Sequence, residues 1–288
     1  MAMGRTSVGR AAQGANRNAR SAANSPGVHL LERGGIAARG IVYVIVGGLT
    51  ASAAVVRGGG AAGSSQALKA IYGEPHGRVL LAVVTIGLFG YALFCFVRSL
   101  LDTEGKGNDA KGVVTRLGYA IVGFAYGAIA WGALQLIRGA GAGSIGGNAS
   151  TQSKTAHALT LPFGKELVII VGIVVIGLGL AQLYCAYTAK FQKELSLGGL
   201  AVEARRAVIA LGRFGYAARG VVFAIVGFFL VIAGLHSSAG AAKGPQGALQ
   251  ALLAQPYGHL LAGIVALGLV AFGLYSIAEA RYRRIGAA

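Results

Sequence analysis

Charged residues are scarce in this sequence, and acidic residues are the scarcest. Asp and Glu together number 9 in 288 residues, and all charged types make up 12% of the chain, whereas 55% of it is hydrophobic. Soluble domains carry about 25% charged residues, because a surface in contact with water needs them. With a mean hydropathy of +0.65, the composition excludes an ordinary soluble protein and indicates a membrane protein.

Cysteine is nearly absent as well, which excludes a disulfide framework. Cys95 and Cys185 are the two cysteines, and neither has a Cys or His at metal-ligand spacing, so both are predicted to be structural thiols. Four histidines fall in loops on one side of the predicted membrane, but no two have the i, i+4 spacing of helical metal ligands. They are His76, His157, His236 and His259. We predict neither a metal site nor a cofactor.

The net charge of +17 does not indicate nucleic-acid binding, because the basic residues lie between apolar segments and not along one stripe with interleaved aromatics. The first 28 residues contain Arg but no acid and no apolar core of signal-peptide length. We interpret 1–28 as a disordered basic tail, with an organellar transit peptide as the alternative.

Six apolar segments are long enough to cross a bilayer as helices, since about 20 residues span its hydrocarbon layer. The predicted helices are 36–56, 79–101, 113–137, 165–189, 214–235 and 258–280. Of the 26 Lys and Arg residues, 17 fall on the side of the two termini and 7 on the opposite side. Because positive charge is retained in the cytoplasm, both termini are predicted to be cytoplasmic.

The chain repeats itself three times. RGGIAARGIVYVIVGG at 33–48 matches RFGYAARGVVFAIVGF at 213–228 in ten of sixteen positions, and RLGYAIVGFAYGAIAW at 116–131 is a third copy in the same register. The second half of each unit repeats too, as a linker, a short amphipathic segment and Pro-x-Gly before the returning helix. These outer turns contain Pro75 and Gly77, Pro162 and Gly164, and Pro256 and Gly258.

Glycines are predicted to mark where the helices pack, because small residues let helix backbones approach closely in lipid. The packing positions are Gly40, Gly47, Gly123, Gly220 and Gly227. Two crossings per unit make the units parallel, so we expect a pseudo-threefold axis along the membrane normal. The predicted fold is an all-α integral membrane protein with repeats at 29–108, 109–195 and 196–288.

The motif R-x-G-[YI]-A…G followed by P-x-G, three times in one six-helix chain, resembles a bacterial membrane family known as "domain of unknown function 1206". The resemblance covers residues 30 to 284. It implies a multi-pass protein of the bacterial inner (plasma) membrane with three helix pairs. It implies no assigned activity and transfers no catalytic residue.

Arg39 and Arg219 are the main candidates for function, since a charge inside a membrane helix is costly and often binds a ligand. An anion or lipid-phosphate site would combine them with Tyr43 and Phe223, four residues on. The alternative is that both arginines lie near a helix end and extend to the headgroups without a further role. The middle repeat has Val122 at the equivalent position, which argues against a site with three arginines.

No enzyme is predicted. The sequence has no nucleotide loop and no paired carboxylates, and Glu166 and Glu279 lie at helix ends with no acid in mid-span. The absence of an intramembrane carboxylate also argues against ion-driven pumping. We favour a non-enzymatic protein that binds or passes a small solute, anion or lipid, with anionic phospholipid as a candidate partner. The alternative is a scaffold subunit without a conduit that binds another membrane protein or its own copies.

Overall fold

The computed structural model describes residues 26–55, 61–101, 110–139 and 148–283, which are helical apart from short turns and loops. In chain order the elements of these ranges are α2 (Pro26–Val55), α3 (Ser64–Gly73), α4 (Gly77–Leu101), α5 (Ala110–Ile137), α6 (Asn148–Leu159), α7 (Gly164–Thr188), the 3-10 helix η1 (Lys190–Glu194), α8 (Val202–Leu235), the 3-10 helix η2 (Ala239–Ala241), α9 (Pro245–Leu253) and α10 (Gly258–Tyr282). The predicted basic tail lies outside these ranges, except that residues 26–28 are helical.

Within the described ranges, six helices are long and apolar enough to cross a membrane: α2, α4, α5, α7, α8 and α10. At 1.5 Å per residue, the 25 residues of α4 exceed the roughly 30 Å of a hydrocarbon layer. The prediction of an all-helical chain with six apolar spans is therefore confirmed, and the protein is a multi-pass membrane protein.

The first helix of each repeat begins earlier than its apolar segment. α2 starts at Pro26, α5 at Ala110 and α8 at Val202, because polar residues can continue a helix that hydropathy alone does not detect. Arg39 and Arg219 consequently lie near the middle of α2 and α8, and not about one turn from a helix end as the sequence suggested.

The Pro-x-Gly turns have the same geometry in all three repeats. The residue before each glycine has a left-handed backbone, with φ of 64° at His76, 59° at Phe163 and 60° at Tyr257. A Cβ added to the following glycine would lie 2.2 Å from a carbonyl oxygen of the preceding short helix or turn, that of Ile71 for Gly77, Ala158 for Gly164 and Leu253 for Gly258. No side chain fits there, so each turn requires its glycine.

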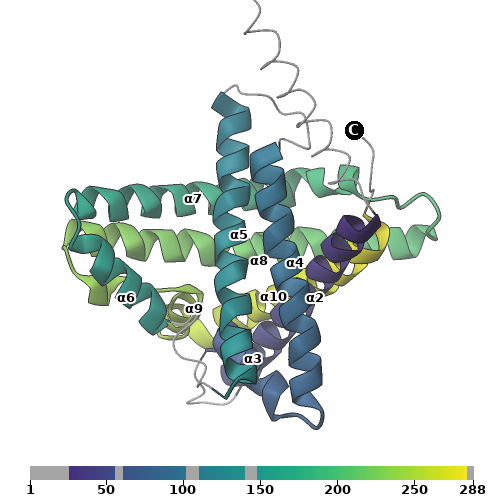
Figure 1. Ribbon diagram of the computed structural model, residues 1–288, viewed down its shortest axis with the longest axis horizontal. Helices are drawn as coiled ribbons and strands as arrows, with labels where there is room; N and C mark the ends of the chain where they lie inside the picture. Colours follow the sequence, from purple (N-terminus) through teal and green to yellow (C-terminus); the bar gives the residue numbers. More distant parts are fainter. Residues whose placement is uncertain (1–25, 56–60, 102–109, 140–147, 284–288) are drawn as a thin grey trace, which may run out of the picture.

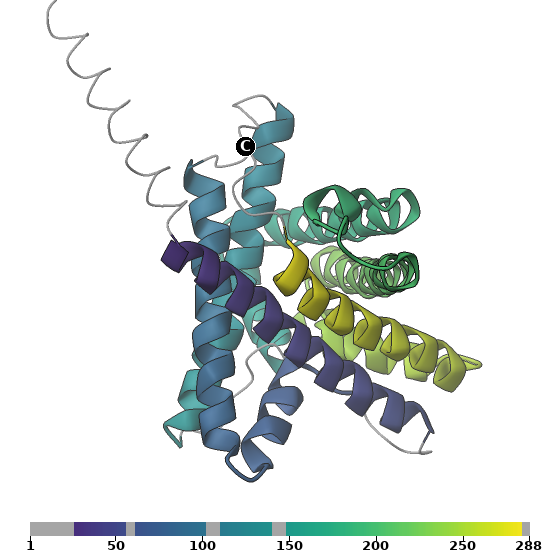
Figure 2. The same ribbon diagram turned by 90° about the vertical axis from the view of Figure 1, so that its right-hand side faces the viewer.

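The long helices form three closely packed pairs: α2 with α10, α4 with α5, and α7 with α8. Each pair joins the returning helix of one repeat to the first helix of the next, and α10 closes on α2. In Figure 1 the α4–α5 pair runs along the vertical of the view and the α7–α8 pair runs across it, while Figure 2 shows α2 and α10 side by side and inclined to α4 and α5. The pairs therefore cross one another steeply.

Within each pair the helix backbones approach at glycines that occupy equivalent positions in the repeats. A Cβ built on these glycines would meet the backbone oxygen of the facing residue: at 2.7 Å for Gly40 on Gly273, 2.9 Å for Gly220 on Gly179, 3.2 Å for Gly123 on Ala92, 2.7 Å for Gly47 on Ala266 and 2.6 Å for Gly227 on Gly172. A Cβ nearer than about 3 Å requires the backbone to move. Close contact of this kind can hold helices together where lipid gives no hydrophobic drive.

Candidate functional site

Arg39 lies inside the bundle with several partners. Its guanidinium donates hydrogen bonds to the Tyr91 hydroxyl at 2.6 Å and to the Ser276 hydroxyl at 3.2 Å, and it pairs with the Glu279 carboxylate at 2.9 Å. The residue is 6% exposed. Arg39 thus links α2 to α4 and α10, and its buried, paired guanidinium argues against the headgroup alternative.

Glu279 belongs to a larger cluster in which three arginines meet three carboxylates. Arg283 pairs with Glu279, with Glu32 at 2.7 Å and with Glu194 at 3.2 Å, and Arg98 lies 3.9 Å from Glu32. Burial alone would lower the pKa of Arg283, but Glu279, Glu194 and Glu32 together raise it above its usual value. The charges of this set, which we call the Glu279 cluster (Glu32, Arg39, Arg98, Glu194, Glu279 and Arg283), cancel. It joins α2, α4, η1 and α10.

Arg219 is almost as buried, at 8% exposed, but its environment is aromatic. Its guanidinium carbon lies 4.4 Å from the ring centre of Phe272 and 5.2 Å from those of Tyr43 and Phe223. No carboxylate pairs with it within the described ranges, and its Nε, like that of Arg39, has no hydrogen-bond partner.

Those ring contacts can offset much of the cost of burying Arg219, but they supply no opposite charge. A desolvated cation–π contact contributes about 2 kcal/mol or more, whereas burying an ion costs several kcal/mol and is ordinarily offset by an opposite charge. Arg39 has that opposite charge in Glu279. Arg219 therefore carries the uncompensated positive charge of the two.

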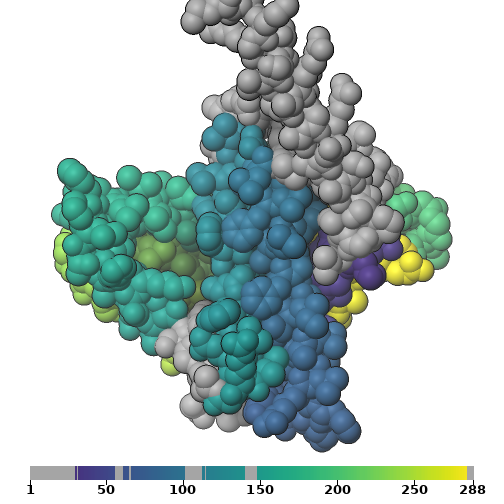
Figure 3. Space-filling view, in the orientation of Figure 1, coloured from purple at the N-terminus to yellow at the C-terminus, as the bar shows by residue number. Residues whose placement is uncertain are grey.

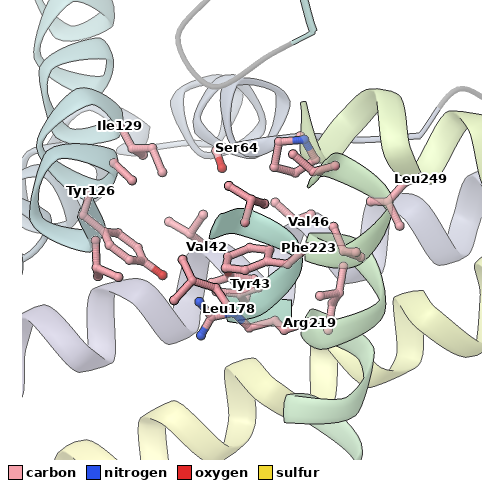
Figure 4. Close-up of a pocket in the computed structure, with 18 of the residues that line it drawn as sticks. Val42, Tyr43, Val46, Ser64, Tyr126, Ile129, Leu178, Arg219, Phe223 and Leu249 are labelled. Atoms are coloured by element: carbon pink, nitrogen blue, oxygen red, sulfur yellow. The ribbon is translucent and has the colours of Figure 1, made fainter. Parts of the chain in front are cut away.

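A cavity of about 270 Å³ lies beside Arg219. Figure 4 shows the Tyr126 hydroxyl directed toward the guanidinium of Arg219, with apolar side chains around them. The polar side chains of the lining are Arg219, Tyr43, Tyr126 and Ser64, and the remaining lining residues are aliphatic, aromatic, proline or glycine. We call this space the Arg219 cavity.

The three first helices contribute equivalent residues to this cavity. In the register of the repeats, its lining includes three sets: Val42, Ala125 and Val222; Tyr43, Tyr126 and Phe223; Val46, Ile129 and Val226. Val175 and Leu178 of α7, Leu269 of α10, and residues at the starts of α3 and α9 complete the wall. All three repeats thus line the cavity, with one cation, Arg219, at one side.

Some of these residues were predicted from the sequence, and others were not. Arg219, Tyr43 and Phe223 do lie together, whereas Arg39 contacts Glu279 instead of the cavity. Tyr126 was missed, although it stands four residues after Val122, in the register of Tyr43 and Phe223.

Glu279 and Phe272 had weaker signals in the sequence. The i, i+4 pair of Glu279 with Arg283 was the clue to the cluster, and nothing local indicated Phe272.

The remaining predicted positions lie away from the cavity. The Pro-x-Gly turns and the packing glycines occupy the turns and helix crossings described above. The four histidines considered as metal ligands are all exposed, and the described residues contain no group of three His, Cys, Asp or Glu side chains able to hold a metal ion.

Chemically, the cavity offers a fixed positive charge in an apolar enclosure. In such surroundings electrostatic attraction is stronger than in water, and guanidinium groups form short bidentate bonds with carboxylate and phosphate. An anionic group of matching size would offset the charge of Arg219, with the Tyr126 hydroxyl available as a further hydrogen-bond partner.

Six apolar helices in three repeats around a cavity define a multi-pass membrane protein with internal repeats. The chain belongs to the family described as Domain of Unknown Function (DUF1206), whose model matches residues 34–102, 117–189 and 214–283. It is similar to "Uncharacterized protein YxxB" of Bacillus subtilis (strain 168), with 32% identity over 260 residues, which is 90% of this chain and 93% of the relative. No solved structure matches the chain.

Proposed function

We propose that this protein is a non-enzymatic plasma-membrane protein that binds a small molecule with an anionic group in the Arg219 cavity. The observation that carries the proposal is the buried guanidinium of Arg219, which faces the cavity without a carboxylate partner among the described residues. A protein keeps an uncompensated buried charge at a cost to its stability, and such residues in membranes commonly mark binding sites.

Arg219, and not Arg39, is the anion-binding residue in this proposal. Arg39 is neutralised by Glu279 at 2.9 Å, so an added anion would compete with a carboxylate already in place. Tyr43 and Phe223 lie against the guanidinium of Arg219, where they would flank a bound anionic group. An anionic phospholipid or a water-soluble anion would both satisfy this chemistry.

The three repeats are proposed to surround a pseudo-threefold axis that passes through the cavity. Two observations support this: α2, α5 and α8 line the cavity with residues in the same register, and the returning helix of each repeat packs on the first helix of the next, with α10 packing on α2. Phe272, which is 0% exposed and lies against Arg219, together with the Glu279 cluster, favours a binding site over an open conduit.

The proposed orientation puts both termini in the cytoplasm and the Pro-x-Gly turns outside. Phe163 and Tyr257 are 83% and 84% exposed, so cysteines placed there, with Cys95 and Cys185 replaced by Ser, should react with a membrane-impermeant maleimide on intact cells. A cysteine at the exposed Arg205 should react only after the membrane is opened. Labelling of the two sites with the opposite pattern would refute this orientation.

Anion binding is tested by stabilisation of the full-length protein in phosphatidylcholine nanodiscs. Inorganic phosphate, sulfate and decanoate are each added while thermal unfolding is followed, and a ligand at a hundredfold excess over its Kd stabilises by about 2.7 kcal/mol. At least one of these anions should raise the Tm of the wild type. Arg219→Gln should lose the effect, and Arg213→Gln, which removes an exposed arginine of the same helix, should keep it.

If no anion distinguishes the wild type from Arg219→Gln, the proposal is refuted. The alternative, a scaffold subunit that binds a membrane protein or its own copies through its lipid-facing surface, would then be the better reading. Its sign would be a stable complex that survives purification equally well with and without Arg219.

A further inference from the structure

We propose that the ligand of the Arg219 cavity is a single-chain amphiphilic acid that enters sideways from the lipid, between α5 and α7. This inference rests on the proposed function and narrows it to a chemical class and a route. The shared chemistry of the candidates is one carboxylate or phosphate on an unbranched or slender apolar chain.

The cavity has an apolar opening beside α5. Ile121 and Ala125 line it and are also exposed, Ile121 by 38%. The neighbouring side chains on the outer surface are apolar as well, with Phe124 of α5 70% exposed and Val174 of α7 40% exposed. Figure 3 shows the surface hollowed next to α5, between α5 and the α6–α7 segment, with α8 visible at the back of the hollow.

This side is open because of how the helices pair. α5 packs mainly on α4, and α7 packs mainly on α8, so the two helices of the middle repeat diverge. In the other two repeats the first and returning helices, α2 with α4 and α8 with α10, do pack on each other. Contact between the first and returning helices closes this gap in the first and third repeats. The middle repeat lacks that contact, which leaves a route between α5 and α7.

Polarity along the cavity matches an amphiphile. Arg219 and Tyr126 provide a polar end, and Val46, Ile129 and Val226 continue the wall as an apolar sleeve, with the Ser64 hydroxyl at its far side (Figure 4). A hydrated inorganic ion would have to cross an apolar rim and lose its water with few donors to replace it, which is costly. An amphiphile already in the bilayer loses no such hydration along its chain and is concentrated at the opening.

The volume limits how much of the ligand is enclosed. A cavity of about 150 Å³ holds a benzene molecule, so about 270 Å³ accommodates roughly ten or eleven heavy atoms by the same measure. That corresponds to an acidic head group with about eight chain carbons. A longer chain would extend through the opening into the lipid. The affinity for the cavity, corrected for partitioning of the ligand into the bilayer, should therefore stop rising beyond this chain length.

The test uses photolabelling of the full-length protein in phosphatidylcholine nanodiscs by palmitic acid that carries a mid-chain diazirine. Labelled residues, located by mass spectrometry, should fall in 121–129 of α5 and 171–178 of α7. Decanoate should compete at least about tenfold better than decanol, since a charge-assisted hydrogen bond is worth about 1.5–3 kcal/mol. Arg219→Gln should remove this preference, and Arg219→Lys should retain part of it.

A second pair of variants tests the route. Ala125→Trp places a large side chain in the opening and should abolish labelling, whereas Leu117→Trp, at a position of α5 that is 57% exposed and outside the cavity lining, should leave it unchanged. Both variants should elute as monodisperse protein, so that lost labelling reports access and not misfolding.

The outcomes separate this inference from the function beneath it. If phosphate competes as well as decanoate, or if Ala125→Trp binds decanoate like the wild type, the amphiphile and its lateral route are refuted while anion binding stands. If neither decanoate nor phosphate distinguishes the wild type from Arg219→Gln, both proposals fall.

Discussion

The two buried arginines offer a matched experiment, because the same substitution at equivalent positions should have very different costs. Arg39→Met removes three hydrogen bonds, including the pair with Glu279 at 2.9 Å, and leaves the Glu279 cluster with an excess negative charge. Breaking a buried ion pair from one side costs about 3–5 kcal/mol. We expect Arg39→Met to lower the free energy of unfolding by that amount.

Arg219→Met should behave differently. It removes ring contacts with Tyr43, Phe223 and Phe272, each worth about 2 kcal/mol or more, but it also removes the cost of an unpaired buried charge, which is several kcal/mol. The two contributions nearly cancel, so the free energy of unfolding should stay within about 1 kcal/mol of the wild type or rise, as is common when a functional residue is replaced.

Both variants can be unfolded with SDS in mixed micelles and followed by the fluorescence of Trp131, the single tryptophan. Arg39→Met with Glu279→Gln should recover part of the loss, because the double variant leaves less unbalanced charge. If Arg219→Met costs as much as Arg39→Met, the distinction between a paired structural arginine and an unpaired one is mistaken.

Two further predictions concern the glycines and turns. Gly40→Ala should destabilise by about 2 kcal/mol or more, since its Cβ would lie 2.7 Å from a backbone oxygen of α10. Gly34→Ala, where nothing lies within 4 Å, should be neutral or stabilise by up to about 1 kcal/mol in SDS unfolding; equal effects would contradict the close crossing. Phe163→Gly should stabilise by about 1 kcal/mol, because glycine adopts the left-handed backbone of this position without strain. The neighbouring Gly164→Ala should reduce the yield of folded protein. If Gly164→Ala proved the more stable of the two in thermal unfolding, the turn geometry would be refuted.

Features set by local sequence were predictable. The six apolar spans follow from hydropathy, and the Pro-x-Gly turns follow from the backbone preferences of two residue types, so both could be placed without knowledge of tertiary contacts. The start of α2 at Pro26 could not, because its first turns mix polar and apolar residues and gain their helical structure as an extension of the apolar segment.

The difference between Arg39 and Arg219 could not be read from their own surroundings in sequence, which are nearly identical. Arg39 and Glu279 are 240 residues apart, and their pairing depends on α10 closing onto α2. Glu279 lies in the last turn of α10, as predicted, but hydropathy gave no sign that it is 4% exposed and lies in an ion cluster. What decides the role of each arginine is the helix that packs against it.

The dependence of each arginine on the helix that packs against it can be tested by substitution. The returning helices carry Arg98, Cys185 and Glu279 at equivalent positions, counted from the glycine of each Pro-x-Gly turn, and α10 packs on α2 as α7 packs on α8. Arg39 thus faces a helix with a carboxylate at this position, and Arg219 faces one with a thiol. Cys185→Glu should give Arg219 the partner that Glu279 gives Arg39.

We therefore expect Cys185→Glu to raise the free energy of unfolding relative to Cys185→Gln, the neutral control of similar size, by about 1 kcal/mol or more. It should also abolish anion-dependent stabilisation, because the new carboxylate would occupy the guanidinium of Arg219. Cys185→Gln should leave anion binding intact. If the Glu and Gln variants have the same stability and the same anion binding, then position 185 does not face Arg219 as position 279 faces Arg39. The lack of a carboxylate partner for Arg219 would then have another cause.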